Sequence, residues 1–191
     1  MDLQWEWGDI STAPGSRGIQ VADWDRDGTN EVLVANSDFI AALHDIGDYR
    51  FSQVWSAPMG VAWGLANLDA DPAQELWVLQ PDGRLLAYDP FSHTPRLLGG
   101  IASPDMSPSD GSPFLAATVT DLLKTGRQEL LVLVSENGHR SLRTYSLPEL
   151  RQTWSYTVER PYTVYFSSRF VFGQVDDDPS LEIILNDGIV I

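Results

Sequence analysis

The stretch Val21-Ala22-Asp23-Trp24-Asp25-Arg26-Asp27-Gly28-Thr29-Asn30-Glu31-Val32-Leu33-Val34 recurs three more times, in altered forms, along this chain of 191 residues. The later copies span residues 65–78, 119–132 and 173–184, and in each a glutamate is followed at once by an apolar run. These glutamates are Glu31, Glu75, Glu129 and Glu182, which lie 44, 54 and 53 residues apart. A period of about 50 residues fits a four-stranded sheet that repeats as one blade of a β-propeller.

The segments between the four phrases favour strands over helices. Their apolar runs are short, rich in Val, Ile and Leu, and bounded by Gly, Pro, Asn or Asp. In the first repeat we expect strands at about 18–22, 31–35, 39–44 and 50–56, separated by turn residues. The segment 99–113 is irregular, and we expect a surface loop there, with a domain boundary as the alternative. The sequence predicts one all-β, antiparallel domain of four blades, at about 16–56, 60–98, 114–156 and 169–191 plus 2–8.

The two ends of the chain suggest how the last blade is completed. Gln53-Val54-Trp55 and Gln152-Thr153-Trp154 mark the fourth strand of the first and third repeats, and Leu3-Gln4-Trp5 resembles them. The fourth repeat offers a second strand at 182–186 and a third at 188–191. We therefore expect strand 2–8 to pair with 188–191 and close the ring, either in one chain or between two chains that form an eight-bladed homodimer. The alternative is a piece cut from a longer protein.

Composition excludes several classes of function. With 12 Lys and Arg against 27 Asp and Glu, the net charge is −15, which repels nucleic acids and favours cations or basic partners. The absence of cysteine excludes thiolate metal sites and disulfides, and the apolar runs are too short for membrane insertion. The three histidines lie in different repeats, and the sequence has neither a nucleophile elbow nor a glycine-rich phosphate loop. We expect no catalytic residues.

The first acidic loop has the composition of a site for a hard cation. Asp23, Asp25 and Asp27 alternate, Gly28 follows, and the Thr29 carbonyl and Glu31 complete a set of oxygen ligands. Calcium takes six to eight oxygens, whereas magnesium demands a stricter octahedron, so calcium is the expected ion. Because Val34 stands where an EF-hand needs its bidentate glutamate, and a strand follows, the loop is not an EF-hand. The alternative is a solvated acidic turn without an ion.

The other loops are weaker candidates for the same ion. The second offers Asn67, Asp69, Asp71 and Glu75, and the fourth offers Gln174, Asp176, Asp178 and Glu182. Both have proline where the first loop has Gly28, so their shape differs. In the third loop, Leu123 and Thr125 replace the middle acids, and we expect side-chain hydrogen bonds to backbone amides to hold that turn without metal.

Seven tryptophans and six tyrosines raise the question of a binding surface. Trp5, Trp55 and Trp154 repeat at one position, so we expect them to pack between blades. Trp24 lies inside the acidic loop, where we expect it to stay exposed, and it is the first candidate for ligand binding. Tyr162 and Tyr165 are the next candidates.

The phrase Asp23-x-Asp25-x-Asp27-Gly28-x-x-Glu31, followed by Val32-Leu33-Val34, resembles the FG-GAP and VCBS-type repeats of integrin-like β-propellers. The shorter variants at 71–75 and 178–182 extend the resemblance over nearly the whole chain, although the Phe-Gly of the family survives only as Phe172-Gly173. The resemblance implies a propeller whose acidic loops join the first two strands of each blade and often hold calcium. It also implies an extracellular or cell-surface location.

The expected function is a non-catalytic binding or interaction module for a protein or glycan ligand. Two alternatives stay open. One is the propeller of a polysaccharide-degrading, lyase-like enzyme, and the other is a structural repeat unit that assembles into a larger ring.

Overall fold

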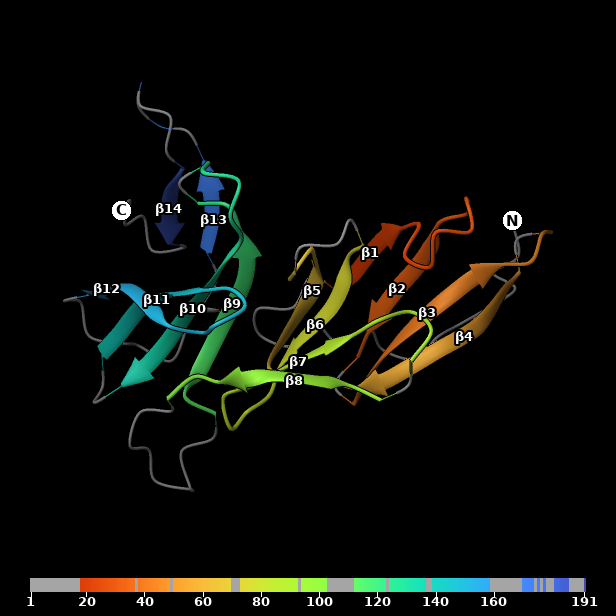
Figure 1. Ribbon diagram of the computed structural model, residues 1–191, viewed down its shortest axis with the longest axis horizontal. Helices are drawn as coiled ribbons and strands as arrows, with labels where there is room; N and C mark the ends of the chain where they lie inside the picture. The colour runs from red at the N-terminus through yellow and green to blue at the C-terminus, as the bar shows by residue number, and fades with distance from the viewer. Residues whose placement is uncertain are drawn as a thin grey trace.

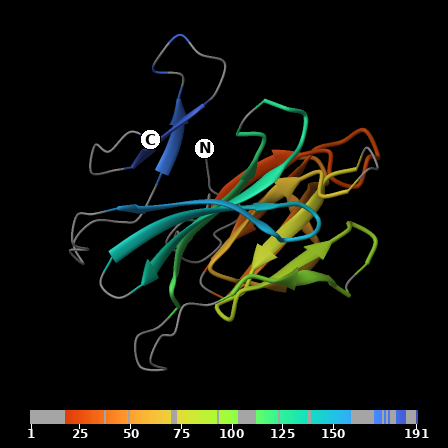
Figure 2. The same cartoon turned by 60° about the vertical axis from the view of Figure 1, so that its left-hand side comes forward.

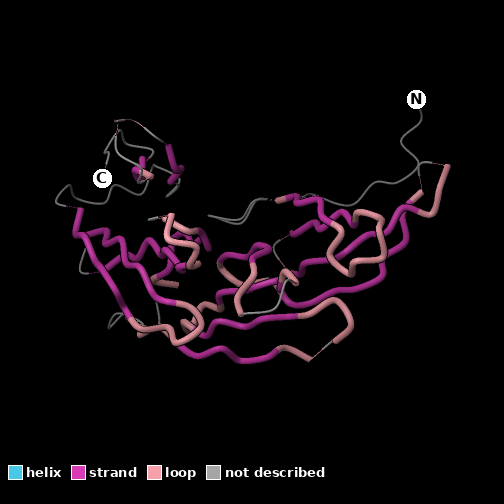
Figure 3. The backbone as a smooth tube through the Cα atoms, turned by 45° about the horizontal axis from the view of Figure 1, so that its top comes forward, coloured by secondary structure: helices cyan, strands magenta, loops and turns pink. Residues whose placement is uncertain are grey.

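The computed structural model describes residues 18–36, 38–48, 50–69, 73–92, 94–102, 112–122, 124–136, 139–158, 170–173, 175, 177, 181–185 and 191. These residues form strands, turns and loops, and no described segment is helical (Figure 3). Accordingly, the described part of the chain contains no helix long and apolar enough to cross a membrane. The all-β prediction is confirmed for these residues.

The strands follow one another as four sheets, here called blades 1 to 4 (Figure 1). Blade 1 contains β1 (Ile19–Ala22), β2 (Glu31–Ala35), β3 (Phe39–Asp45) and β4 (Phe51–Pro58). Blade 2 contains β5 (Ala62–Ala66), β6 (Glu75–Leu79), β7 (Arg84–Tyr88) and β8 (Arg96–Gly100). Blade 3 contains β9 (Phe114–Thr120), β10 (Glu129–Glu136), β11 (His139–Ser146) and β12 (Gln152–Val158). The described part of blade 4 contains β13 (Phe170–Gly173) and β14 (Glu182–Leu185).

Each complete blade is an antiparallel meander in which consecutive strands are neighbours. In blade 1, Val32 stands opposite Val21 on one side and opposite Leu43 on the other. Side chains that are directly opposite share a face of the sheet, so each blade has two faces with period-two alternation. The four strands predicted for the first repeat are confirmed, each within two residues. The irregular connection after blade 2 begins later than predicted, because Gly99 and Gly100 still pair in β8.

Successive blades pack face to face through apolar cores. Between blades 1 and 2 the buried set includes Leu33, Ile40 and Trp55 from one sheet and Trp63 and Leu76 from the other. Similar clusters lie between blades 2 and 3 and between blades 3 and 4. Fully burying one such Leu or Ile side chain contributes about 1.5–3 kcal/mol. The blades are therefore joined by continuous hydrophobic seams.

The first strands of neighbouring blades approach each other, as they do around the axis of a propeller. β5 contacts β9, and the Leu65 amide of β5 donates to the Gln20 side chain of β1 at 3.2 Å. Blades 1 and 4 lie at opposite ends of the series (Figures 1 and 2), so the described blades make an open series. Residues 2–8 and 186–190, on which the closure prediction depends, lie outside the described residues. Ile191 exchanges two backbone hydrogen bonds with Ile183 of β14, at 2.8 and 3.0 Å.

Candidate metal centre in the first acidic loop

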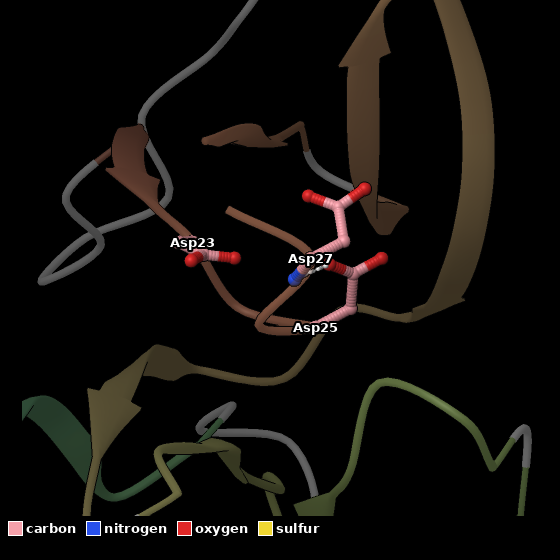
Figure 4. Close-up of side chains that lie close together, drawn as sticks. All are labelled: Asp23, Asp25 and Asp27. Atoms are coloured by element: carbon pink, nitrogen blue, oxygen red, sulfur yellow. Dashed lines mark hydrogen bonds between the residues drawn. The ribbon is translucent and has the colours of Figure 1, made fainter. Parts of the chain in front are cut away.

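The three aspartates of the first loop lie together. Asp23 follows β1, and Asp25 and Asp27 come from the turn that leads to β2 (Figure 4). One carboxylate oxygen from each lies within 4.8 Å of the others. Oxygens at about 2.3–2.6 Å from a calcium ion lie this close to one another, so the cluster is compatible with calcium. The donor set is hard and anionic, as calcium prefers.

Backbone amides hold these three side chains in place. The Asp27 amide donates to Asp25 Oδ1 at 3.1 Å, the Thr29 amide to Asp27 Oδ1 at 2.7 Å, and the Gly28 amide to Asp23 Oδ2 at 3.2 Å. Arg26 and Gly28 have positive φ of 62° and 92°, which turns the chain back on itself between the aspartates. The loop thus gathers negative charge through local hydrogen bonds.

Glu31, the fourth predicted carboxylate ligand, is outside this cluster. Its side chain is 1% exposed, and Oε2 accepts from the backbone amides of Trp24 at 3.0 Å and Asp25 at 3.4 Å. Oε1 lies 3.1 Å from Nδ1 of His44 on β3. The described contacts of Glu31 therefore fasten the loop to the sheet.

The same contact recurs at the glutamates of blades 2 and 4. The Leu68 amide donates to Glu75 Oε2 at 2.7 Å, and the Val175 amide donates to Glu182 Oε2 at 2.7 Å. In each case the donor lies seven residues before the glutamate, as Trp24 does before Glu31. A glutamate at the start of the second strand therefore has a structural role that explains its recurrence.

The third loop has the backbone of the first without its middle acids. Lys124 and Gly126 have positive φ of 51° and 81°, at the positions of Arg26 and Gly28. Asp121 accepts from the amides of Thr125 at 2.8 Å and Gly126 at 2.6 Å. The prediction that side-chain hydrogen bonds hold this turn is confirmed. The turn therefore does not require acids at positions 123 and 125.

In the second loop, an arginine stands beside one predicted ligand. Arg96 Nη2 of β8 lies 3.0 Å from Asp69 Oδ2, and the Asp69 amide donates to Asn67 Oδ1 at 3.3 Å. Glu75 is 6% exposed and holds the Leu68 amide, as described above. Asp71 lies outside the described residues, as do Gln174, Asp176 and Asp178 of the fourth loop. In the second loop, the positively charged Arg96 side chain thus pairs with Asp69.

The expectation that Trp24 stays exposed is wrong. Its side chain is 3% exposed and packs in the seam between blades 1 and 2, edge-on to Trp55 at 5.0 Å between ring centroids. The alternation that sends Asp23 and Asp25 outward sends Trp24 inward, and burying an indole removes a large apolar area from water. Trp24 is therefore not available to stack on a ligand. Tyr162 and Tyr165 lie outside the described residues.

His44 is a neighbour of the site that the sequence did not reveal. The hydrogen bond to Glu31 raises the pKa of His44 above its ordinary value, and the negative charges of Asp27, Glu31 and Asp25 act in the same direction against partial desolvation. The register of β2 and β3 places Leu43 opposite Val32 and so brings His44 to Glu31. Strand pairing was needed to find it, because 13 residues separate the two side chains.

No family model matches this chain, and no curated protein matches it. Among solved structures, a europium-containing methanol dehydrogenase aligns with 84% of this chain at 17% identity and a TM-score of 0.49. The chain spans 27% of the length of that protein. Two structures of BBS1N in complex with ARL6DN, soaked with mercury or lead, align with 93% of this chain at 10% and 9% identity, with TM-scores of 0.35 and 0.37, and this chain covers 77% of each. The description of the fold therefore rests on the sheets themselves.

Proposed function

We propose that this chain is a non-catalytic β-propeller module that binds a protein or glycan ligand and whose first acidic loop binds calcium. The observation that supports the ion is the cluster of Asp23, Asp25 and Asp27, whose carboxylates converge within 4.8 Å. Like charges at this separation repel one another, and a divalent cation relieves that repulsion. In this proposal the Thr29 carbonyl supplies a further oxygen. An extracellular or cell-surface location belongs to the proposal because the resemblance implies it.

The third loop supports the view that the turn folds without the acids that would bind an ion. It adopts the same pair of positive-φ residues with Asp121 alone as its acid anchor. Asp25 and Asp27 are thus additions to a turn that already folds, and ion binding gives them a role. Each aspartate uses one oxygen for a backbone amide, and we propose that the second oxygen faces the ion.

Thermal melts in chelator and in millimolar calcium test the proposal. At a free calcium concentration one hundred times the dissociation constant, binding stabilises the native state by about 2.7 kcal/mol. For a domain of this size we expect the melting temperature to rise by about 5–10 °C. Asp25→Asn removes one ligand charge at nearly constant shape and should abolish most of the shift. Asp48→Asn, the same change at a residue exposed by 91% in the β3–β4 turn, is the matched control. Superimposable parent melts in the two buffers would refute calcium binding.

A structural role in a larger ring is the second candidate, and two exposed side chains of β1 favour it. Counted from the repeated glutamates, Ile19 and Val21 occupy the positions of Trp63 and Leu65 in blade 2. Trp63 is 2% exposed against blade 1, whereas Ile19 and Val21 are exposed by 54% and 61%. A further blade that packs on blade 1 as blade 1 packs on blade 2 would cover them.

Sedimentation velocity distinguishes this second candidate. A homodimeric ring should sediment as a dimer, and Val21→Asp should convert it to monomer. Ile46→Asp is the control because Ile46 is an exposed apolar residue in a turn, away from the sheet faces. A parent protein that stays monomeric at high concentration contradicts assembly between copies of this chain.

A further inference from the structure

A pocket of about 390 Å³ lies between blade 3 and the part of blade 4 that contains β14 and Ile191. Its apolar walls include Leu122, Leu181, Ile183 and the Trp154 indole. Its polar groups include the carboxylate of Glu129 and the hydroxyl of Thr153. The volume falls within the range of small-ligand sites, which combine apolar walls with a few polar groups. The Asp23–Asp27 loop is no part of this pocket.

Trp154 is the aromatic wall, and its surroundings differ from those of its counterpart Trp55. Trp55 is 3% exposed, lies edge-on to Tyr88 at 5.2 Å, and donates its indole N–H to the Ser92 carbonyl. Trp154 is exposed by 38% and stacks nearly parallel to Tyr156, with ring centroids 6.2 Å apart. Most of Trp154 is buried, as expected for packing between blades, but the residue is far more exposed than Trp55. Its surface is open to a ligand where Tyr88 covers Trp55.

Glu129 supplies negative charge to the pocket. In blade 1 the equivalent Glu31 faces the imidazole of His44, 3.1 Å away. In blade 3 the residue opposite Glu129 is Ser146, whose buried hydroxyl has no hydrogen-bond partner among the described residues. Glu129 Oε1 accepts from the Thr153 hydroxyl at the long distance of 3.4 Å. Blade 3 thus lacks the imidazole that accompanies the carboxylate in blade 1.

We propose that this pocket binds an organic cation, with its ammonium or guanidinium group at Glu129 and its apolar stem against Trp154. Three features on the same face support this: the carboxylate, the exposed indole and the small Ser146 in place of a histidine. A cation beside an indole face gains a favourable interaction with the ring, and one that donates to a carboxylate makes a strengthened hydrogen bond. The source is a free amine or a Lys or Arg side chain of a peptide. This inference rests on the binding role proposed above and is independent of the calcium loop.

Titrations of the full chain with matched charged and neutral probes test the proposal. N-acetylarginine amide is compared with its neutral isostere N-acetylcitrulline amide, and benzylammonium with benzyl alcohol. Calorimetry gives the affinity, and the indole N–H signal of Trp154, assigned through Trp154→Phe, reports the location. We expect the cations to bind at least about tenfold more tightly than their isosteres, which corresponds to about 1.4 kcal/mol. Preference for benzylammonium indicates a free amine, and preference for the arginine derivative indicates a peptide.

Glu129→Gln should weaken each cation about tenfold or more, toward the affinity of its isostere, and leave the isosteres unchanged. Asp48→Asn, which removes the same charge far from the pocket, should change neither, so it controls for attraction by the net charge of −15. The proposal would be overturned if charged and neutral probes bound equally, or if the Trp154 signal did not shift. It would also be overturned if methyl glucoside, a probe for glycan binding, bound more tightly than the cations. Both variants should retain the calcium-dependent melting shift, so failure of the pocket and failure of the calcium site are distinguishable.

Discussion

The recurring glutamate leads to a prediction whose size follows from the structure. Glu75 is 6% exposed, and its carboxylate accepts from the Leu68 amide at 2.7 Å. A hydrogen bond to a charged group contributes about 1.5–3 kcal/mol, and a buried amide left without an acceptor costs about 1–3 kcal/mol. We therefore expect Glu75→Ala to lower the free energy of unfolding by about 3 kcal/mol. Glu75→Gln keeps an acceptor and should cost about 1 kcal/mol.

Urea unfolding followed by circular dichroism measures these differences. With a slope of about 2 kcal/mol per molar urea, a loss of 3 kcal/mol moves the midpoint down by about 1.5 M. Glu149→Ala is the control, because Glu149 is an exposed glutamate in a turn and should change stability by less than about 0.5 kcal/mol. The loss at Glu75 should be the same in chelator and in calcium. A Glu75→Ala protein as stable as the control, or a loss seen only with calcium, would refute the structural role.

Three further predictions concern other parts of the structure. The pKa of His44 is raised in the folded state. The stability that this adds is therefore complete below the unfolded-state pKa and is lost as pH rises through the folded-state pKa. His44→Gln should accordingly destabilise the fold more at about pH 5.5 than at about pH 8.5. Equal losses in urea unfolding at both pH values would contradict this. Gly83→Ala should lower the free energy of unfolding by more than about 2 kcal/mol, because Gly83 has a φ of 86° and an added Cβ would meet the Ile101 carbonyl. Gly28→Ala, with open space around the added Cβ, should lower it by about 1 kcal/mol. The same unfolding assay checks it, and similar losses would disprove it. Trp55→Ala should lower the free energy of unfolding by about 3–5 kcal/mol, and Trp154→Ala by distinctly less, since Trp154 is 38% exposed. Calorimetric melts in which Trp154→Ala is the more destabilised variant would contradict this.

The blades and the acidic cluster could be predicted from the sequence, because both follow from local patterns. The repeated glutamate marks the start of β2, β6, β10 and β14, and alternate spacing brings Asp23, Asp25 and Asp27 to one turn. The exposure of two tryptophans was less predictable: Trp24 is buried, contrary to expectation, and Trp154 is more exposed than Trp55. Their exposure depends on what the neighbouring blade presents to each ring, which no single repeat contains. The partners of Glu31 and the charged pocket at Glu129 likewise depend on cross-strand register.

The shared backbone of the first and third loops has a consequence for how such chains diversify. One acid at the start of the turn and one glycine near its end suffice to shape it, as Asp121 and Gly126 do. In the calcium proposal, ion binding in blade 1 then depends on Asp25 and Asp27, and positions 123 and 125 of the sequence correspond to them in the third loop. On that proposal, substitution at these two places would gain or lose an ion while the turn keeps its shape. The proposal thus predicts that the number of bound ions would be free to change in evolution, or by engineering, while the blades keep their architecture.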